Sequence, residues 1–422
     1  MRRIGTDGGT KGVVDALMHK DTSLSAFSRL SRRQFLRGAG ALLTTTFLNA
    51  RLNAMSSEPR TYPLEVLPPE HQQMKDPVTG ADLLFVTTHP ARDVNLYFHE
   101  RSFLADESML LFISERERGG LMGYLFATGE LVRIGTPEGG VGNATAAKSR
   151  NSVFVLRGKQ VLELAIKIEP SADPLKAASR VFATERVVCT LPEHLSPATA
   201  LNENADGRLL SLGVNVKEGG VGIITIDVRT GKVREVCRME TFGGHVQWSH
   251  TFPYLLSFAG RTERLMVVDI RDGKPRAIYH QIQGELVTHE HWWVKDQMLF
   301  CGGHRDGESH VKIINPFTGE VRIIGAGAWW EGGTPAQYAK VNWWHPAGDE
   351  NGRWVAADNW HGDIVLFDAK TTRMHLLTTG HRTYGGGDHP HVGWDRRSKR
   401  VVFTSHKLGN PNVCVATIPE KW

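Results

Sequence analysis

The feature that most constrains the fold is a polar turn that recurs at a nearly constant distance along the second half of the chain. Short apolar runs end in such turns at DVRTGK (227–232), DIRDGK (269–274), NPFTGE (315–320) and DAKTTR (368–373). The turn glycines Gly231, Gly273 and Gly319 are 42 and 46 residues apart. A repeat in the forties that contains several short strands is typical of a β-propeller blade.

The chain from residue 55 onward has this strand-and-turn character throughout. Runs typical of strands lie at LLFVTT (83–88), MLLFIS (109–114), VFVLR (153–157), LLSLGV (209–214), GIITIDV (222–228), LMVVDI (265–270), IVLFDA (364–369) and RVVFTSH (400–406). The length of this region corresponds to seven or eight repeats, and we favour seven. We therefore predict an all-β fold, a seven-bladed β-propeller over residues 55–422, with an array of β-sandwiches as the alternative.

Residues 1–54 have the pattern of an export signal. Arg32 and Arg33 form a pair within SRRQFLR (31–37), which precedes the weakly apolar stretch GAGALLTTTFLNARLNA (38–54). A paired arginine before a modest apolar run is typical of a twin-arginine signal, which is read by a receptor. The stretch is too short and too polar to span a bilayer. We expect a periplasmic protein without a stable membrane anchor that uses the twin-arginine translocation machinery; a disordered basic N-terminus is the alternative.

The positive charge of the chain belongs to this N-terminal segment. Residues 1–54 hold nine Lys and Arg against three Asp and Glu, while the whole chain has a net charge of +5. The remaining residues therefore have a net charge of about −1. Such a balance gives no reason to expect nucleic-acid binding.

The cysteines give no sign of a metal knuckle or a redox motif. Cys189, Cys237, Cys301 and Cys414 are widely spaced, and the chain contains no CxxC. An export compartment permits a disulfide, but a core of this size does not need one. We expect buried free thiols.

Histidine and tryptophan gather in the second half of the chain. Fourteen of the nineteen histidines and all eleven tryptophans lie from His245 onward, in the clusters GGHVQW (243–248), VTHEHWW (287–293), NWWH (342–345) and GGGDHPH (385–391). His245, His289, His345 and His389 are separated by 44, 56 and 44 residues, which is close to the blade repeat. Because equivalent positions in different blades converge on the propeller axis, we expect these side chains to line one cavity. The alternative is a set of histidines that are each satisfied separately by the backbone.

Converging imidazoles suit a divalent transition metal such as manganese, zinc, nickel or iron, and spacing alone does not choose among them. His389 and His391 flank a proline and could donate from one rigid strand, although residues two apart share a strand face without any metal. The chain has no GxSxG, HExxH or Walker motif. A metal beside a free imidazole instead suits proton abstraction next to a carboxylate, and tryptophan faces suit sugar rings.

Several stretches together resemble the oligogalacturonate lyases. The resemblance covers most of the chain after residue 55 and includes DPVTGADLLFVTT (76–88), NLYFHERSFLADESMLLFIS (95–114), GGHVQW, VTHEHWW and HPHVGWDRRSKRVVFTSHKLGNPNVCVATIP (389–419). It implies a seven-bladed propeller that cleaves oligomers of galacturonic acid by β-elimination. It further implies that His245 is the catalytic base and that Mn²⁺ is bound by His289, His389 and His391.

The chain departs from the family pattern at two places. Gly386 stands where the family has a glutamine ligand, and Asp388, His345 or water could take its place. The stretch Lys217–Gly222 lacks the arginine that supports the base in the family, and Lys217 is the nearest cation in the sequence. The interpretations that remain open are a lyase for oligogalacturonates, a lyase for another uronate oligomer, and a non-catalytic propeller that binds sugar or protein.

Overall fold

The computed structural model describes residues 58–304, 309–325, 343–359, 362–381 and 389–422. The chain divides into two units, Met1–Asn53 and Ala54–Trp422, and all of the described residues belong to the second. The predicted export signal, with Arg32 and Arg33, lies outside the described residues. Within them, no helix has the length and apolar character needed to cross a membrane.

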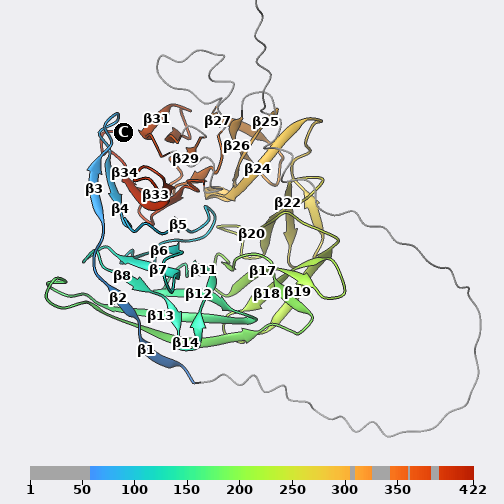
Figure 1. Ribbon diagram of the computed structural model, residues 1–422. Coiled ribbons are helices and arrows are strands. Elements are labelled where there is room, and N and C mark those ends of the chain that lie inside the picture. The colour runs from blue at the N-terminus through green and yellow to red at the C-terminus, as the bar shows by residue number, and fades with distance from the viewer. Residues whose placement is uncertain (1–57, 305–308, 326–342, 360–361, 382–388) are drawn as a thin grey trace, which may run out of the picture. The chain divides into compact units, whose positions relative to one another are not determined.

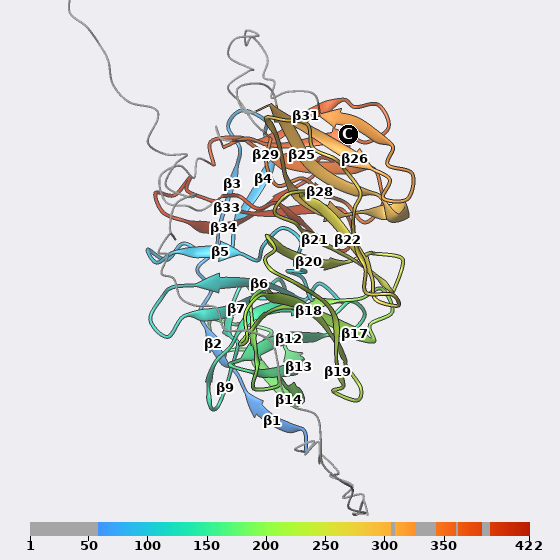
Figure 2. The ribbon, with the colours of Figure 1, turned by 90° about the vertical axis from the view of Figure 1, so that its right-hand side faces the viewer.

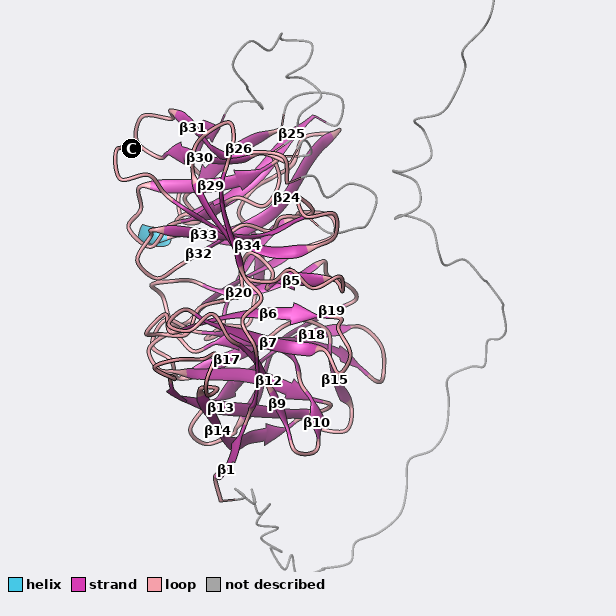
Figure 3. Ribbon diagram, turned by 60° about the vertical axis from the view of Figure 1, so that its left-hand side comes forward, coloured by secondary structure: helices cyan, strands magenta, loops and turns pink. Residues whose placement is uncertain are grey.

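The second unit is a seven-bladed β-propeller (Figure 1), which confirms the predicted fold. Apart from the single turn η2 (Val294–Asp296), its regular structure is antiparallel strand (Figure 3). The predicted strand 109–114 is β6 (Met109–Ser114), and most of the other predicted strands differ from the observed ones by one or two residues at an end; the predicted strand 83–88 is β4 (Asp82–Phe85) and ends three residues early. The bounds of the strands follow, blade by blade.

The first blade has the order β2 (Glu65–Leu67), β8 (Leu131–Arg133), β7 (Gly120–Leu125), β6, β5 (Asp93–Asn95). The second has the order β1 (Arg60–Pro63), β14 (Arg180–Thr190), β13 (Gln160–Glu169), β12 (Ser152–Arg157), β11 (Gly142–Ala146), and the hairpin β9 (Gly135–Thr136) and β10 (Gly139–Gly140) precedes it. The third comprises β15 (Leu195–Pro197), β16 (Asn202–Glu203), β17 (Leu209–Val216), β18 (Val221–Asp227) and β19 (Val233–Met239).

The fourth blade comprises β20 (Gly244–Trp248), β21 (Leu255–Ala259), β22 (Leu265–Asp269) and β23 (Pro275–Ala277). The fifth comprises β24 (Glu285–Trp292), β25 (Met298–His304), β26 (His310–Ile314) and β27 (Val321–Gly325). The sixth comprises β28 (Ala347–Gly348), β29 (Trp354–Asp358), β30 (Ile364–Asp368) and β31 (Met374–Thr378). The seventh has the order β3 (Gln72–Lys75), β4, β34 (Asn412–Thr417), β33 (Arg400–Ser405), β32 (Gly393–Trp394).

The hydrophobic core is divided among the contacts between neighbouring blades. Seven clusters of buried apolar side chains occur in the described residues, and each combines residues of two adjacent blades, including the pair formed by the seventh and the first. Figure 2 shows the corresponding sheets lying one above another in the side view. A central strand is therefore covered on both faces, which explains apolar runs such as MLLFIS that do not alternate.

The ring is closed by strands from both ends of the described chain. β4 pairs with β34, with Phe85 opposite Cys414 and Leu83 opposite Ala416, and Figure 1 shows these blue and red strands side by side. The four cysteines are free, and three of them, including Cys414, are buried. The closure therefore rests on strand pairing and packing.

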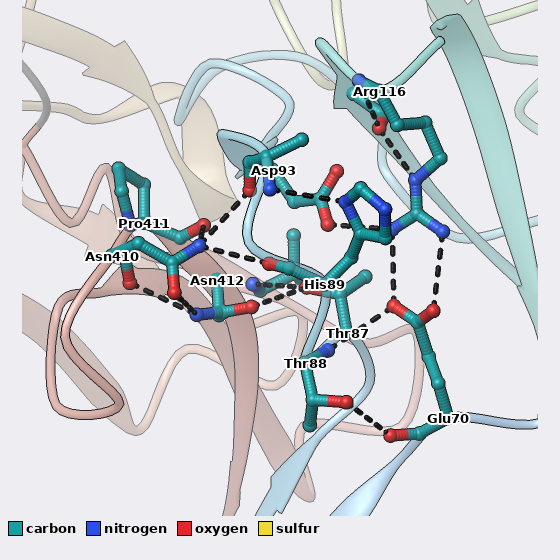
Figure 4. A network of polar contacts seen from close by, with 12 residues as sticks. Glu70, Thr87, Thr88, His89, Asp93, Arg116, Asn410, Pro411 and Asn412 are labelled. Carbon is teal, nitrogen blue, oxygen red and sulfur yellow. Dashed lines mark hydrogen bonds and ion pairs between the residues drawn. The ribbon is translucent and has the colours of Figure 1, made fainter.

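A polar network ties this closed blade to the first (Figure 4). Arg116 donates two hydrogen bonds to Glu70, at 3.0 and 3.2 Å, and one to Asp93 at 2.7 Å. Asn410 donates to the backbone oxygens of His89 and Ala91. The side chain of Asp93 is 0% exposed, so Arg116 is the cation that compensates a fully buried carboxylate.

Replacement of this cation should destabilise the propeller. We expect Arg116→Met to lower the free energy of unfolding by about 3–5 kcal/mol, because it leaves the Asp93 carboxyl buried without its charge partner. Urea denaturation followed by tryptophan fluorescence measures the change. Lys75→Met is the matched control, because its ion pair with Asp82 is 69% exposed on both sides and should contribute less than about 1 kcal/mol. Equal losses in the two variants would contradict the assignment.

Candidate active site and metal centre

The innermost strands of several blades carry histidines to the propeller axis. His245 lies in β20, His289 lies in β24, and His345 and His391 stand two residues before the first residues of β28 and β32. The ring centroids of His289 and His345 are 4.2 Å apart, those of His345 and His391 are 4.3 Å apart, and those of His245 and His289 are 6.2 Å apart. The structure therefore brings together the histidines that the blade spacing predicted to converge.

A repeated backbone irregularity aims these side chains. His245, His289 and His391 have φ values of 55°, 55° and 49°, in the left-handed region that non-glycine residues avoid. The pairing of β20 shifts register between Gly244 and Gln247, and that of β24 shifts between Thr288 and His291. Such bulges turn a side chain out of the regular alternation, and each left-handed residue costs on the order of 1–3 kcal/mol. Conformations of this cost persist where the surrounding structure enforces them and are concentrated at functional sites.

Three imidazoles form a candidate metal centre. The ligand atoms of His345, His389 and His391 lie within 4.8 Å of one another. His345 Nδ1 is 3.0 Å from Asp358 Oδ1, and its buried Nε2 has no hydrogen-bond partner among the described residues. An imidazole that holds a carboxylate on one nitrogen and leaves the other unsatisfied is the usual arrangement of a metal-ligating histidine. Burial lowers the pKa of His345 and of His391 well below the usual value, so both are neutral donors. These residues fit a divalent transition metal.

The remaining residues that the sequence suggested as metal ligands are His289 and Asp388. His289 packs against His345, but its ligand atoms do not belong to the group of three, and its buried Nδ1 has no hydrogen-bond partner among the described residues. His345, one of the residues considered for the place of the family's glutamine, is a member of the group. Asp388 and Gly386 lie outside the described residues.

His245 lies beside this centre in a network of its own. Its Nδ1 is 3.1 Å from Glu290 Oε1 and 3.2 Å from Arg264 Nη2, and its Nε2 is 3.1 Å from the hydroxyl of Tyr97. Arg264 Nε also donates to Glu290 Oε2 at 2.9 Å. Burial by itself raises the pKa of Glu290, but its interactions with His245 and Arg264 prevail and lower it to about 2. Glu290 is therefore ionised, and its charge favours a proton on Nδ1, whereas the guanidinium of Arg264 faces the same nitrogen and can only donate. In the tautomer protonated on Nδ1, the lone pair of Nε2 is directed at Tyr97.

Sequence reasoning missed Arg264, Glu290, Tyr97 and Asp358. Glu290 belongs to the THE motif that was quoted for its histidine, and Tyr97 belongs to NLYFHE, so both had a visible signal. Arg264 had no such signal. It directly precedes β22, 19 residues after His245 in the sequence, and only the folding of the blade brings the two side chains together. Lys217, the cation that was considered for this support, is exposed.

The tryptophans divide into two groups. Trp248, Trp292 and Trp343 are at most 2% exposed and pack in the clusters between blades, which is the other role that a large ring can take in a propeller. Trp344 is different, because its ring lies 5.3 Å from that of His289 and 6.5 Å from that of His389. Trp344 is therefore placed to form a wall beside the candidate metal centre.

Comparisons with known proteins support the fold. No protein-family model matches the sequence, and no curated protein matches it. Among solved structures, an oligogalacturonate lyase in complex with manganese matches with a TM-score of 0.68 at 17% identity, over 85% of this chain and 98% of that one. An oligogalacturonate lyase from Vibrio parahaemolyticus matches with the same TM-score and identity, over 86% of this chain and all of that one. The shared property is the fold.

The candidate centre predicts a metal-binding stoichiometry. The purified full chain should bind one divalent transition metal, and His345→Ala should weaken that binding more than tenfold because it removes the buried ligand nitrogen. Asp358→Asn should weaken it by about 10–100-fold, since the carboxylate orients that imidazole. Titration calorimetry with Mn²⁺ and elemental analysis of the purified protein measure both effects. His280→Ala, at a side chain that is 80% exposed, is the control. Unchanged affinity in His345→Ala would exclude this centre.

Proposed function

We propose that the protein is a metal-dependent lyase that cleaves oligogalacturonates by β-elimination. The observation that carries the proposal is the placement of a carboxylate-oriented His245 beside three converging imidazoles at the axis of a propeller. The structural likeness to two oligogalacturonate lyases supports it through the fold. The resemblance of the sequence motifs to that family is a separate support.

The roles of the chain's own residues follow from the geometry. His345, His389 and His391 would hold the divalent cation, with His289 beside them; Mn²⁺ is the ion that we propose. When bound, such a cation neutralises the uronate carboxylate and acidifies the neighbouring C–H bond. His245 Nε2 removes the C5 proton, the C4=C5 double bond forms as the C4–O bond breaks, and the departing oxygen takes up a proton from water, so that the product has an unsaturated end. Glu290 holds the tautomer that leaves Nε2 free for this task, and Arg264 fixes the carboxylate of Glu290.

Export is part of the proposal. The paired arginines Arg32 and Arg33 support passage through the twin-arginine machinery into the periplasm. That route carries folded proteins, which suits a propeller whose site draws residues from several blades. Expression of the full chain fused to a reporter, with Arg32→Lys and Arg33→Lys introduced together, tests it; export that does not depend on these residues would contradict the proposal.

The activity itself has a direct assay. With Mn²⁺ present, oligogalacturonates should give ultraviolet absorbance from the new double bond, and His245→Ala should lower kcat by about 10²–10⁴-fold, the usual contribution of a general base. The same variant should bind Mn²⁺ as the wild type does. Oligomers of other uronic acids form the second arm of the assay. A folded, metal-loaded protein that is inactive on every uronate oligomer would overturn the proposal in favour of a non-catalytic binding propeller.

Glu290 acts through His245, so its effect should be separable from metal and substrate binding. Glu290→Gln keeps the shape but removes the charge that holds the Nδ1 proton, and we expect kcat to fall about 10²-fold with KM nearly unchanged. Steady-state kinetics measures the split between the two constants, and Mn²⁺ titration checks that the metal centre is intact. Glu263→Gln is the control, because Glu263 lies on the blade that carries His245 but pairs with the exposed His280. A rise in KM alone would assign Glu290 to substrate binding.

A further inference from the structure

The inner strands that carry the histidines continue to a second group of charged residues. In four blades, a charged or ionisable residue stands five positions after a residue in or just before the inner strand. The pairs are Asn143 and Lys148, His245 and His250, His345 and Glu350, and His391 and Arg396. In the first blade, Arg101 follows Tyr97 by four residues. These residues lie in the turns that follow the inner strands, and in the blades that carry histidines of the candidate site they come after these histidines in the chain. They belong to the opposite end of the central channel.

A cavity of about 70 Å³ is present at that end. Its lining includes Arg101, Arg396, His250 and His291. Phe98 also lines it, and the ring of Phe98 contacts those of His245, His289 and His345 at centroid distances of 5.6–5.9 Å. Phe98 is 3% exposed and separates this cavity, which we call the basic cavity, from the candidate metal centre. This volume has room for a small ion with a few waters.

Arg101 and Arg396 line the basic cavity, and Lys148 lies next to it, where it contacts the lining residue His250. The hydrogen bonds that Arg396 and Lys148 donate go to uncharged groups. Arg396 donates to the backbone oxygens of Phe103, Ala147 and Lys148 at 2.9–3.1 Å. Lys148 Nζ donates to the backbone oxygen of His250 at 3.2 Å. These carbonyls satisfy hydrogen bonds but leave the positive charges uncompensated.

Arg101 supplies an open donor. Its Nη2 donates to the backbone oxygen of Glu203 at 3.0 Å, while its buried Nη1 has no hydrogen-bond partner among the described residues. Nδ1 of His291, in the same lining, is also buried without a partner there. A buried guanidinium with an unsatisfied N–H is costly unless an acceptor reaches it.

The neighbouring acids do not balance these cations. Glu203 and Glu350 both attract the three cations, but Glu203 is already paired with Arg150 at 3.0 Å, and Glu350, which also lines the cavity, is exposed. Burial raises the pKa of Glu100, in the lining, to about 8, so this side chain is mostly neutral at pH 7. Burial, with the mutual repulsion of the cations added to it, lowers the pKa of Arg396 to about 10 and also lowers that of Lys148. The basic cavity thus has a net positive charge in a low-dielectric channel.

We propose that the basic cavity binds a small oxyanion, with Arg101 Nη1 as the principal donor and Arg396 and Lys148 as the compensating charges. A phosphate, a sulfate and a carboxylate share the required acceptor chemistry. The bound anion neutralises charges contributed by the first, second and seventh blades, and so stabilises the ring at the end opposite the metal centre. The proposal is independent of the lyase activity.

The test is anion binding to the full chain in the absence of uronate. Sodium phosphate, sulfate, acetate and galacturonate are titrated at constant ionic strength against chloride, and the midpoint of thermal unfolding and the heat of binding are recorded. We expect a saturable rise of the midpoint with at least one oxyanion, and an apparent Kd at least tenfold weaker in Arg101→Met. Arg396→Gln should also weaken binding. This variant serves as the test if Arg101→Met does not fold.

Two controls separate this cavity from other anion sites. His345→Ala removes a ligand of the candidate metal centre and should leave the anion effect unchanged. Arg271→Met removes an exposed cation that pairs with Asp269, and should also leave it unchanged. No effect beyond that of chloride, or an effect that survives in Arg101→Met and Arg396→Gln but disappears in His345→Ala, would overturn the proposal.

Discussion

The pairing of β4 with β34 is the constraint on which the rest of the structure depends. A ring of blades buries both faces of every sheet only when the last blade packs against the first, and this blade takes strands from both ends of the described chain. The cluster that contains Val402, Val413 and Leu110 forms the seventh interface only in the closed ring. Closure also places His391, on the seventh blade, next to His345 on the sixth and Tyr97 on the first. The candidate site therefore exists because the ring is closed.

Within that ring, the bulged inner strands determine what faces the axis. A regular strand alternates its side chains and packs half of them between blades. The left-handed residues at His245, His289 and His391 interrupt this alternation, and Asn143 repeats the device in the second blade. The strain is borne by sheets that are held on both faces by neighbouring blades. The geometry of the site is thus supported by the same packing that stabilises the fold.

The fold could be predicted from the sequence, because the blade period is a local property repeated many times. The convergence of the histidines could be predicted for the same reason, since spacings of 44 and 56 residues place them at similar phases of successive blades. The ligand set could not be decided this way. Whether His289 or His345 faces His389 depends on bulges, and a left-handed histidine has no sequence signature of the kind that glycine gives. Arg264 was missed because it lies in the turn between β21 and β22, and the sequence does not show that this turn lies next to His245. The roles of the individual tryptophans could not be predicted because a large ring suits a sugar and a gap between blades equally well.

The placement of Phe98 links the two ends of the channel. Its buried ring contacts His289, His291 and His345, and burial lowers the pKa of these three imidazoles, which favours their neutral form. Neutral imidazoles are required both of metal ligands and of a base. The cations of the basic cavity act in the same direction, because a positive potential along a low-dielectric channel opposes protonation of histidine and attracts carboxylates. An anion held by Arg101 would reduce that potential and keep it from destabilising the inner strands. The ring of Phe98 thus keeps the neighbouring imidazoles unprotonated at one end of the channel, while the proposed anion would balance the cations at the other.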